Sequence, residues 1–215
     1  MDFSRDEIGD ALARELYLSA GLDPALASGA PSVAAAVLGE SCLHFVPHDD
    51  LPCRSLIWHF GLHWTIYVRE SLNGRQLNHA VAHALGGWFL QCRGYCAADV
   101  EALSSSVAAA ICVPRPALLV ALGQLGEDLP ALSRQFQVSE SLMVLRMAEC
   151  LGSPTALITA KVVLTRGEPR EWPATRAEWV GLVGRVRLHE NGLTLRSLSD
   201  SPERLVLQFR EQHAR

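Results

Sequence analysis

The stretch Asn73-Gly-Arg-Gln-Leu-Asn-His-Ala-Val-Ala-His-Ala-Leu-Gly-Gly-Trp-Phe-Leu90 is the part of the sequence from which the rest is interpreted. Its apolar residues recur at spacings of three and four, which is the period of an amphipathic helix; they are Leu77, Val81, Leu85 and Trp88. Asn73 is suited to cap the start, with Gln76 three residues later in the capping-box position. The sequence therefore predicts a single helix over 73–90.

Two histidines lie four residues apart on this helix. His79 and His83 project from the same face, one turn apart, and two imidazoles in that arrangement can share a zinc ion. The spacing is the metal-binding half of the HExxH motif, in which the Glu after the first His is a general base. Ala80 occupies that position here. The stretch is therefore a zinc-peptidase helix without its base, or a chance pair of histidines on a helix surface.

Composition and charge narrow the class of protein. The 215 residues are 49% hydrophobic and 20% charged, which predicts one globular domain, or one domain with a small appendage. A net charge of −4 argues against direct, non-specific binding of nucleic acid. The acidic N-terminus does not resemble a signal peptide, and the apolar run 107–122 is interrupted by Pro114 and Pro116, so no membrane segment is expected. We therefore expect a cytoplasmic protein with reduced cysteines.

The chain before the histidine stretch is expected to change from helices to strands. Periodicity predicts helices over 5–20 and 32–39, followed by strands between Cys42 and Arg69. In the last part of this region the apolar residues fall on even positions: Trp58, Phe60, Leu62, Trp64, Ile66 and Val68. This alternation predicts a half-buried antiparallel strand or a tight hairpin, with the even side chains facing inward.

The chain after the stretch is expected to be helical and then strand-rich. A helix over 98–113 should end at Pro114, and 117–151 is also helical in pattern. Strands are predicted in 156–165, 184–198 and 204–209, with a hairpin turn at Asn191-Gly192. The expected fold class is α+β, a helical core with a small antiparallel sheet. We expect one domain over 1–153 and a strand-rich appendage over 154–215, which either stands apart or packs into the same domain.

A zinc peptidase requires a third protein ligand, which usually comes from a following helix. Glu101 is the best candidate, and Asp99 is its close rival.

At this point the sequence resembles the ImmA/IrrE family of zinc metallopeptidases, over roughly residues 40–150. In that family a strand leads to an HExxH helix, and a Glu then opens a helix of small residues that ends in aliphatic residues and a Pro. Glu101 precedes Pro114 by thirteen residues, and Ala108-Ala109 and Ile111-Cys112-Val113-Pro114 fit the rest of the pattern. Residues 132–139 and 142–146 resemble the family segment LA-x-x-F-x-VS followed by Arg.

The resemblance implies a zincin-like core and zinc held by His79, His83 and Glu101. It also implies that the carboxylate missing at position 80 is the general base. The implied substrate is a helix-turn-helix transcriptional repressor, cleaved in a stress, mobile-element or phage-defence response. A second alignment places Ala82-His83-Ala84-Leu85-Gly86-Gly87 on the family segment AHELGH, but it loses both the Glu and the second His. We prefer the alignment with His79 because it keeps both metal ligands.

Ala80 has two explanations. It marks either a naturally inactive relative or a catalytic Glu replaced by engineering, and the intact pattern around it favours the second. The expected function is thus a zinc-dependent endopeptidase that is inactive, or nearly so, with Ala80. The alternatives are a pseudopeptidase that binds a regulatory partner protein without cutting it, and a structural helical domain without metal.

Overall fold

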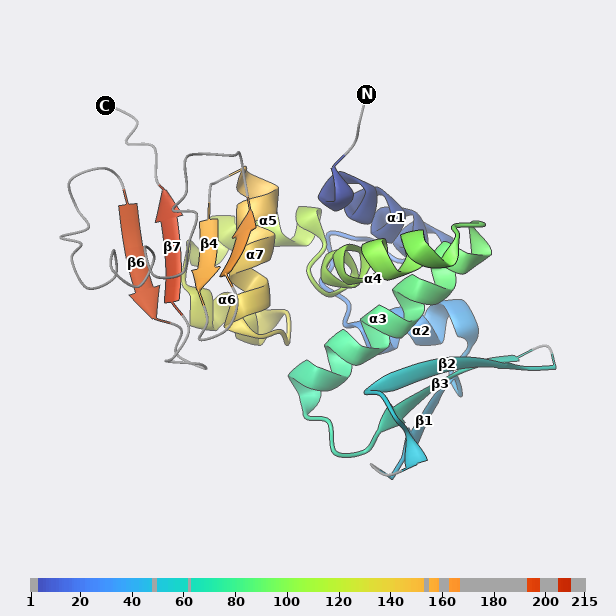
Figure 1. The fold of residues 1–215 in the computed structure, drawn as a ribbon. Helices are drawn as coiled ribbons and strands as arrows, with labels where there is room; N and C mark the ends of the chain where they lie inside the picture. The colour runs from blue at the N-terminus through green and yellow to red at the C-terminus, as the bar shows by residue number, and fades with distance from the viewer. Residues whose placement is uncertain are drawn as a thin grey trace. The chain divides into compact units, whose positions relative to one another are not determined.

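The computed structural model describes residues 4–47, 50–61 and 63–152, together with the backbone of four later strands. The chain divides into two compact units, Met1–Val138 and Ser139–Arg215, which are treated separately here (Figure 1). We expected the division after residue 153. The unit boundary instead places the last described helix with the C-terminal strands.

The helices of the first unit form where local sequence signals predict them. They are α1 (Arg5–Ser19), α2 (Ala30–Leu38), α3 (Gly74–Cys92), α4 (Ala97–Cys112), α5 (Arg115–Leu125) and α6 (Leu129–Gln135). The capping box at the start of α3 is confirmed. The Gln76 N–H donates to the Asn73 side chain at 3.0 Å, and the Asn73 N–H donates to the Gln76 side chain at 3.2 Å. The helical region expected over 117–151 is divided because Gly126, at φ +60°, ends α5 and Asp128 caps a new helix.

Helices α1, α3 and α4 pack closely because a glycine lies at each of two contacts between them. Helix α4 packs against both α1 and α3 (Figure 1). A Cβ atom at Gly9 of α1 would lie 2.9 Å from the backbone carbon of Ser106, and one at Gly86 of α3 would lie 3.1 Å from Cγ1 of Val107. Glycine therefore allows the helix axes to approach more closely than any larger residue would. These contacts also fix how α3 and α4 are aligned along their lengths.

The first unit contains a three-stranded sheet in the order β1-β3-β2. The strands are β1 (Leu43–Val46), β2 (Ser55–Phe60) and β3 (His63–Arg69). Strand β2 is antiparallel to β3, but β1 is parallel to β3, so the sheet is mixed where we expected an antiparallel one. The α+β class is confirmed.

The hairpin between β2 and β3 reverses which positions face inward. Phe60 pairs with His63 across a turn that contains Gly61 at φ +61°, so even positions of β2 share a face with odd positions of β3. Ile66 of β3 is fully buried, as expected, whereas Phe60 of β2 is 77% exposed. The expectation that all even side chains face inward is therefore wrong for β2, and Leu62 lies outside the described residues.

The second unit begins with α7 (Glu140–Leu151), whose start is capped by the Ser139 side chain. Strands β4 (Thr155–Ile158), β5 (Val163–Arg166), β6 (Leu193–Ser197) and β7 (Leu205–Phe209) form a sheet in the order β5-β4-β7-β6. All neighbouring strands in it are antiparallel. The expected strand-rich region is confirmed in these four segments, and the hairpin predicted at Asn191-Gly192 lies outside the described residues.

Among the described helices, none is by itself long and apolar enough to cross a membrane. Only α4 and α5 taken together reach that length and composition, and their axes are bent by 44°.

Candidate functional site

Helix α3 is held against the β2–β3 hairpin at two points. Near its start, the Ser55 hydroxyl on β2 donates a hydrogen bond of 2.8 Å to the backbone carbonyl oxygen of Ala80. Nearer its end, the rings of Trp64 on β3 and Trp88 on α3 meet edge to face, with centroids 6.0 Å apart. Contacts of this kind fix both the position and the rotation of a helix relative to a sheet. The histidine-bearing part of α3 therefore lies beside β2.

Asn78 fixes the same part of α3 from within the helical core. Its side chain is 1% exposed, and its carbonyl oxygen accepts a hydrogen bond of 2.7 Å from the Ala30 N–H at the start of α2. Its amide group donates to the backbone carbonyl oxygens of Phe136, at 3.0 Å, and of Gln137, at 3.3 Å. These three bonds tie α3 to α2 and to the turn after α6.

The two histidines lie together as the sequence predicts. The ring centroids of His79 and His83 are 6.3 Å apart, with the planes inclined by 35°. His79 is half-buried and His83 is exposed. Burial, followed by the nearby His83 and Arg54, lowers the pKa of the His79 imidazole below its usual value of 6.5. His79 is therefore neutral at neutral pH, which is the form that can accept a hydrogen bond or bind a metal.

The third ligand expected at Glu101 does not join the histidines. Gly86 lies against Val107, and Gly87 lies next to Ser104, so α3 and α4 run antiparallel and Glu101 lies toward the end of α3. With a rise of 1.5 Å per residue, Glu101 is displaced along the helices by roughly 13 Å from His83. The rival Asp99 lies farther away still, where its carboxylate is 3.1 Å from the sulfur of Cys96.

The donor set for a zinc centre is consequently incomplete. Within residues 4–47, 50–61 and 63–152, no group of three or more His, Cys, Asp or Glu side chains is arranged to hold a metal ion. A catalytic zinc site uses three protein ligands, and only His79 and His83 are brought together here. Ala80, at the position of the general base, is 3% exposed and supplies no proton acceptor. The residues present do not fit the zinc centre that the sequence led us to expect.

Strand β2 has an open edge. It lies at the end of the described sheet. The Arg69 N–H donates to the Arg54 carbonyl oxygen at 3.2 Å, so these two residues form a hydrogen-bonded pair. Such pairs recur at every second residue of an antiparallel ladder, so Leu56 and Trp58 also form hydrogen-bonded pairs with β3. By the alternation of an antiparallel ladder, Ser55, Ile57 and His59 direct their backbone N–H and C=O groups away from β3. The Ser55 carbonyl oxygen already accepts a hydrogen bond of 3.0 Å from the Cys53 thiol, so another extended chain would pair mainly with Ile57 and His59.

The outward face of β2 is apolar. Leu56 is 40% exposed, Trp58 is 56% exposed and Phe60 is 77% exposed, and all three lie on the face opposite to the buried Ile66. The strand Ser55–Phe60 contains no Lys, Arg, Asp, Glu or Pro. Natural edge strands usually carry such residues because they prevent pairing with other chains. An unprotected, apolar edge strand is typical of a surface that is covered by a partner.

Comparisons with known proteins give a likeness of fold alone. No protein-family model matches the sequence, and no curated protein sequence matches it. A transcriptional regulator of known structure from Mycobacterium tuberculosis is similar, with a TM-score of 0.52 and 17% sequence identity. The alignment covers 76% of this chain but 57% of the regulator, so the chain spans little more than half of that protein's length.

Proposed function

We propose that the chain is a non-catalytic, peptidase-like protein that binds an extended segment of a regulatory partner protein along the edge of β2. The observation that carries this proposal is the open edge itself. The backbone groups of Ser55, Ile57 and His59 point outward from a strand that lacks every residue type that usually protects an edge. Main-chain hydrogen bonds to such an edge provide affinity, and the exposed side chains provide specificity.

The site on α3 supports binding without hydrolysis. The Ser55 hydroxyl on β2 is hydrogen-bonded to the Ala80 carbonyl oxygen on α3, so β2 lies beside the histidine-bearing part of α3. Position 80 nevertheless lacks a carboxylate, and Glu101 is remote from the histidines along α4. The groups that would activate a water molecule are therefore not assembled, and we derive no hydrolytic step.

The partner in this proposal is a helix-turn-helix transcriptional repressor. The sequence resemblance implies this class of protein, and the structural neighbour is named a transcriptional regulator. The six cysteines are free thiols, which suits a partnership inside the reducing cytoplasm.

The test uses proline at positions whose N–H faces the open edge. Ile57→Pro and His59→Pro each remove one outward donor without removing a hydrogen bond to β3. The control Ile57→Val keeps the donor and the strand. Binding of the co-encoded helix-turn-helix protein is measured by titration calorimetry with the full chain.

Each proline is expected to weaken binding by about tenfold, since one hydrogen bond contributes roughly 1 kcal/mol and proline also obstructs the approaching strand. Ile57→Val should bind like the unsubstituted chain. Equal affinity for all four proteins, with unchanged melting temperatures, would contradict the proposal, as would the absence of any binding by the unsubstituted chain.

A zinc-dependent endopeptidase is the second candidate, because one specific observation favours it. His79 and His83 keep their ligand spacing on α3, beside the edge strand on which a substrate would lie. The decisive variant is Ala80→Glu, incubated with the same partner and zinc, with and without a chelator, and followed by mass spectrometry of fragments. Chelator-sensitive cleavage by either form would establish the peptidase. If the partner protein stays intact in every sample, the peptidase is excluded and the binding function remains.

A further inference from the structure

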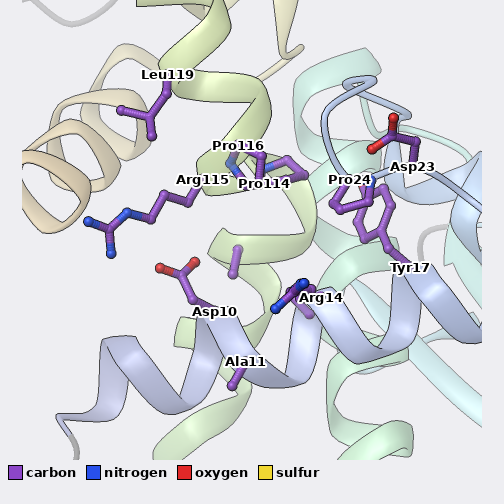
Figure 2. A pocket seen from close by; sticks show the side chains of 12 residues that line it. Asp10, Ala11, Arg14, Tyr17, Asp23, Pro24, Pro114, Arg115, Pro116 and Leu119 are labelled. Atoms are coloured by element: carbon purple, nitrogen blue, oxygen red, sulfur yellow. The ribbon is translucent and has the colours of Figure 1, made fainter.

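A separate pocket lies within the first unit, away from α3 and β2. It has a volume of about 540 Å³ and is formed by α1, the turn at Asp23-Pro24, the end of α4 and the start of α5 (Figure 2). Sites for small organic molecules have volumes of roughly 300–1,000 Å³. The residues that line this pocket do not include Ser55, Ile57 or His59, which form the proposed partner-binding edge.

The wall of the pocket is largely apolar. It includes Tyr17, Pro24, Pro114 and Pro116, together with small alanines such as Ala110. Figure 2 shows Tyr17 and Pro24 next to one another at one end of the pocket. Pro24 is half-buried and Pro116 is exposed, so their rings present accessible, preformed apolar surfaces on which an aromatic ring can pack. The alanines leave space where larger side chains would fill it.

Tyr17 lines the pocket, but the residue is 0% exposed and its hydroxyl is engaged elsewhere. The hydroxyl oxygen lies 2.8 Å from the Ser28 carbonyl oxygen and 2.9 Å from the Ile111 carbonyl oxygen. Burial, with a smaller effect of Cys112, raises the pKa of the phenol far above its usual value, so Tyr17 stays neutral. Polar recognition of a ligand must therefore come from other lining residues.

Arg14 is placed to provide that recognition. It lines the pocket from α1 and is exposed, and among the described residues no carboxylate forms an ion pair with it. Arg115 lines the pocket from the start of α5 and adds a second positive charge. The acids at the pocket are Asp10 and Asp23, and Asp23 accepts a hydrogen bond of 2.8 Å from the Ala25 N–H. A guanidinium without a carboxylate partner favours an anionic group at this wall of the pocket.

We propose that this pocket binds a small aromatic carboxylate. The aromatic ring lies against Pro24 and Pro116, and the carboxylate accepts hydrogen bonds from Arg14. A pocket of this volume also accommodates a short linker between the ring and the carboxylate. The structure thus assigns the chain a small-molecule site in addition to its protein-binding edge, and the two are independent of each other.

The test uses 1-naphthylacetate as the probe and 1-naphthylacetamide as its neutral analogue, both titrated into the full chain by calorimetry. Arg14→Gln removes the charge and leaves a shorter side chain that can still donate a hydrogen bond. Arg5→Gln, on the same helix but outside the pocket, is the matched control. Ala11→Trp fills the pocket from an exposed position, so it should not disturb the core.

The carboxylate is expected to bind about tenfold more tightly than the amide, which corresponds to a charge-assisted hydrogen bond. Arg14→Gln should remove that difference, Ala11→Trp should abolish binding of both probes, and Arg5→Gln should change neither. Three results would each overturn the proposal. They are no binding of 1-naphthylacetate at millimolar concentration, equal affinity for carboxylate and amide, and binding that survives Ala11→Trp.

Discussion

The clearest stability prediction concerns Asn78, whose side chain joins three parts of the helical core. Asn78→Ala removes its carbonyl oxygen and leaves the Ala30 N–H without an acceptor in a buried position. An unsatisfied buried donor costs roughly 1–3 kcal/mol. The carbonyl oxygens of Phe136 and Gln137 lose a donor as well, although the longer of these two bonds, 3.3 Å, contributes less. We therefore expect the free energy of unfolding of the first unit to fall by about 2–4 kcal/mol.

The assay is urea denaturation followed by far-ultraviolet circular dichroism, which is dominated by helices. With a denaturant dependence of about 2 kcal/mol per molar urea, the midpoint should fall by about 1–2 M. Gln91→Ala is the matched control, because Gln91 is exposed on the same helix. A midpoint for Asn78→Ala no lower than that of Gln91→Ala would refute the reasoning.

Three further predictions concern pH, packing and thiol access. Because the folded state lowers the pKa of His79 below 6.5, the unfolded state takes up this proton first as the pH falls. The free energy of unfolding should thus decrease below about pH 6.5, measured with a chelator present, and His79→Gln should reduce that decrease. Gly86→Val should lower the melting temperature, because even a Cβ atom at position 86 would lie 3.1 Å from Val107. The free energy of unfolding should fall by about 1–3 kcal/mol. An unchanged melting temperature would contradict the α3–α4 contact. The folded chain should react rapidly with a thiol reagent at its exposed cysteines, which are Cys53, Cys92 and Cys96. It should react slowly at the buried ones, which are Cys42, Cys112 and Cys150. Mass spectrometry counts the modified thiols over time.

The sequence predicts α3 closely because its signals are local. The capping box of Asn73 and Gln76 and the apolar period lie within one helix, and Pro114 likewise ends α4 by its own chemistry. The spacing along the chain does not give the distance of Glu101 from the histidines, because that distance depends on a non-local contact, that of Gly86 with Val107. Nothing in the spacing of ligands along the chain reveals how two helices are aligned.

The outward face of β2 was missed for a related reason, although the sequence contained a signal. Even positions are apolar in both strands, and a period of two does not indicate which face is buried. Once Gly61 is placed in a tight turn, Phe60 must pair with His63, and one strand must then direct its apolar side chains outward. The location of the turn, more than the alternation, determines the exposed row.

The open edge of β2 also has a consequence for how the chain behaves at high concentration. Without a partner, a strand that lacks charged residues and proline can pair with a copy of itself, so the free chain should self-associate as its concentration rises. A partner segment competes for the same backbone groups, and by mass action it raises the concentration at which self-association begins. The yield of soluble chain should therefore depend on how much of the partner is produced together with it.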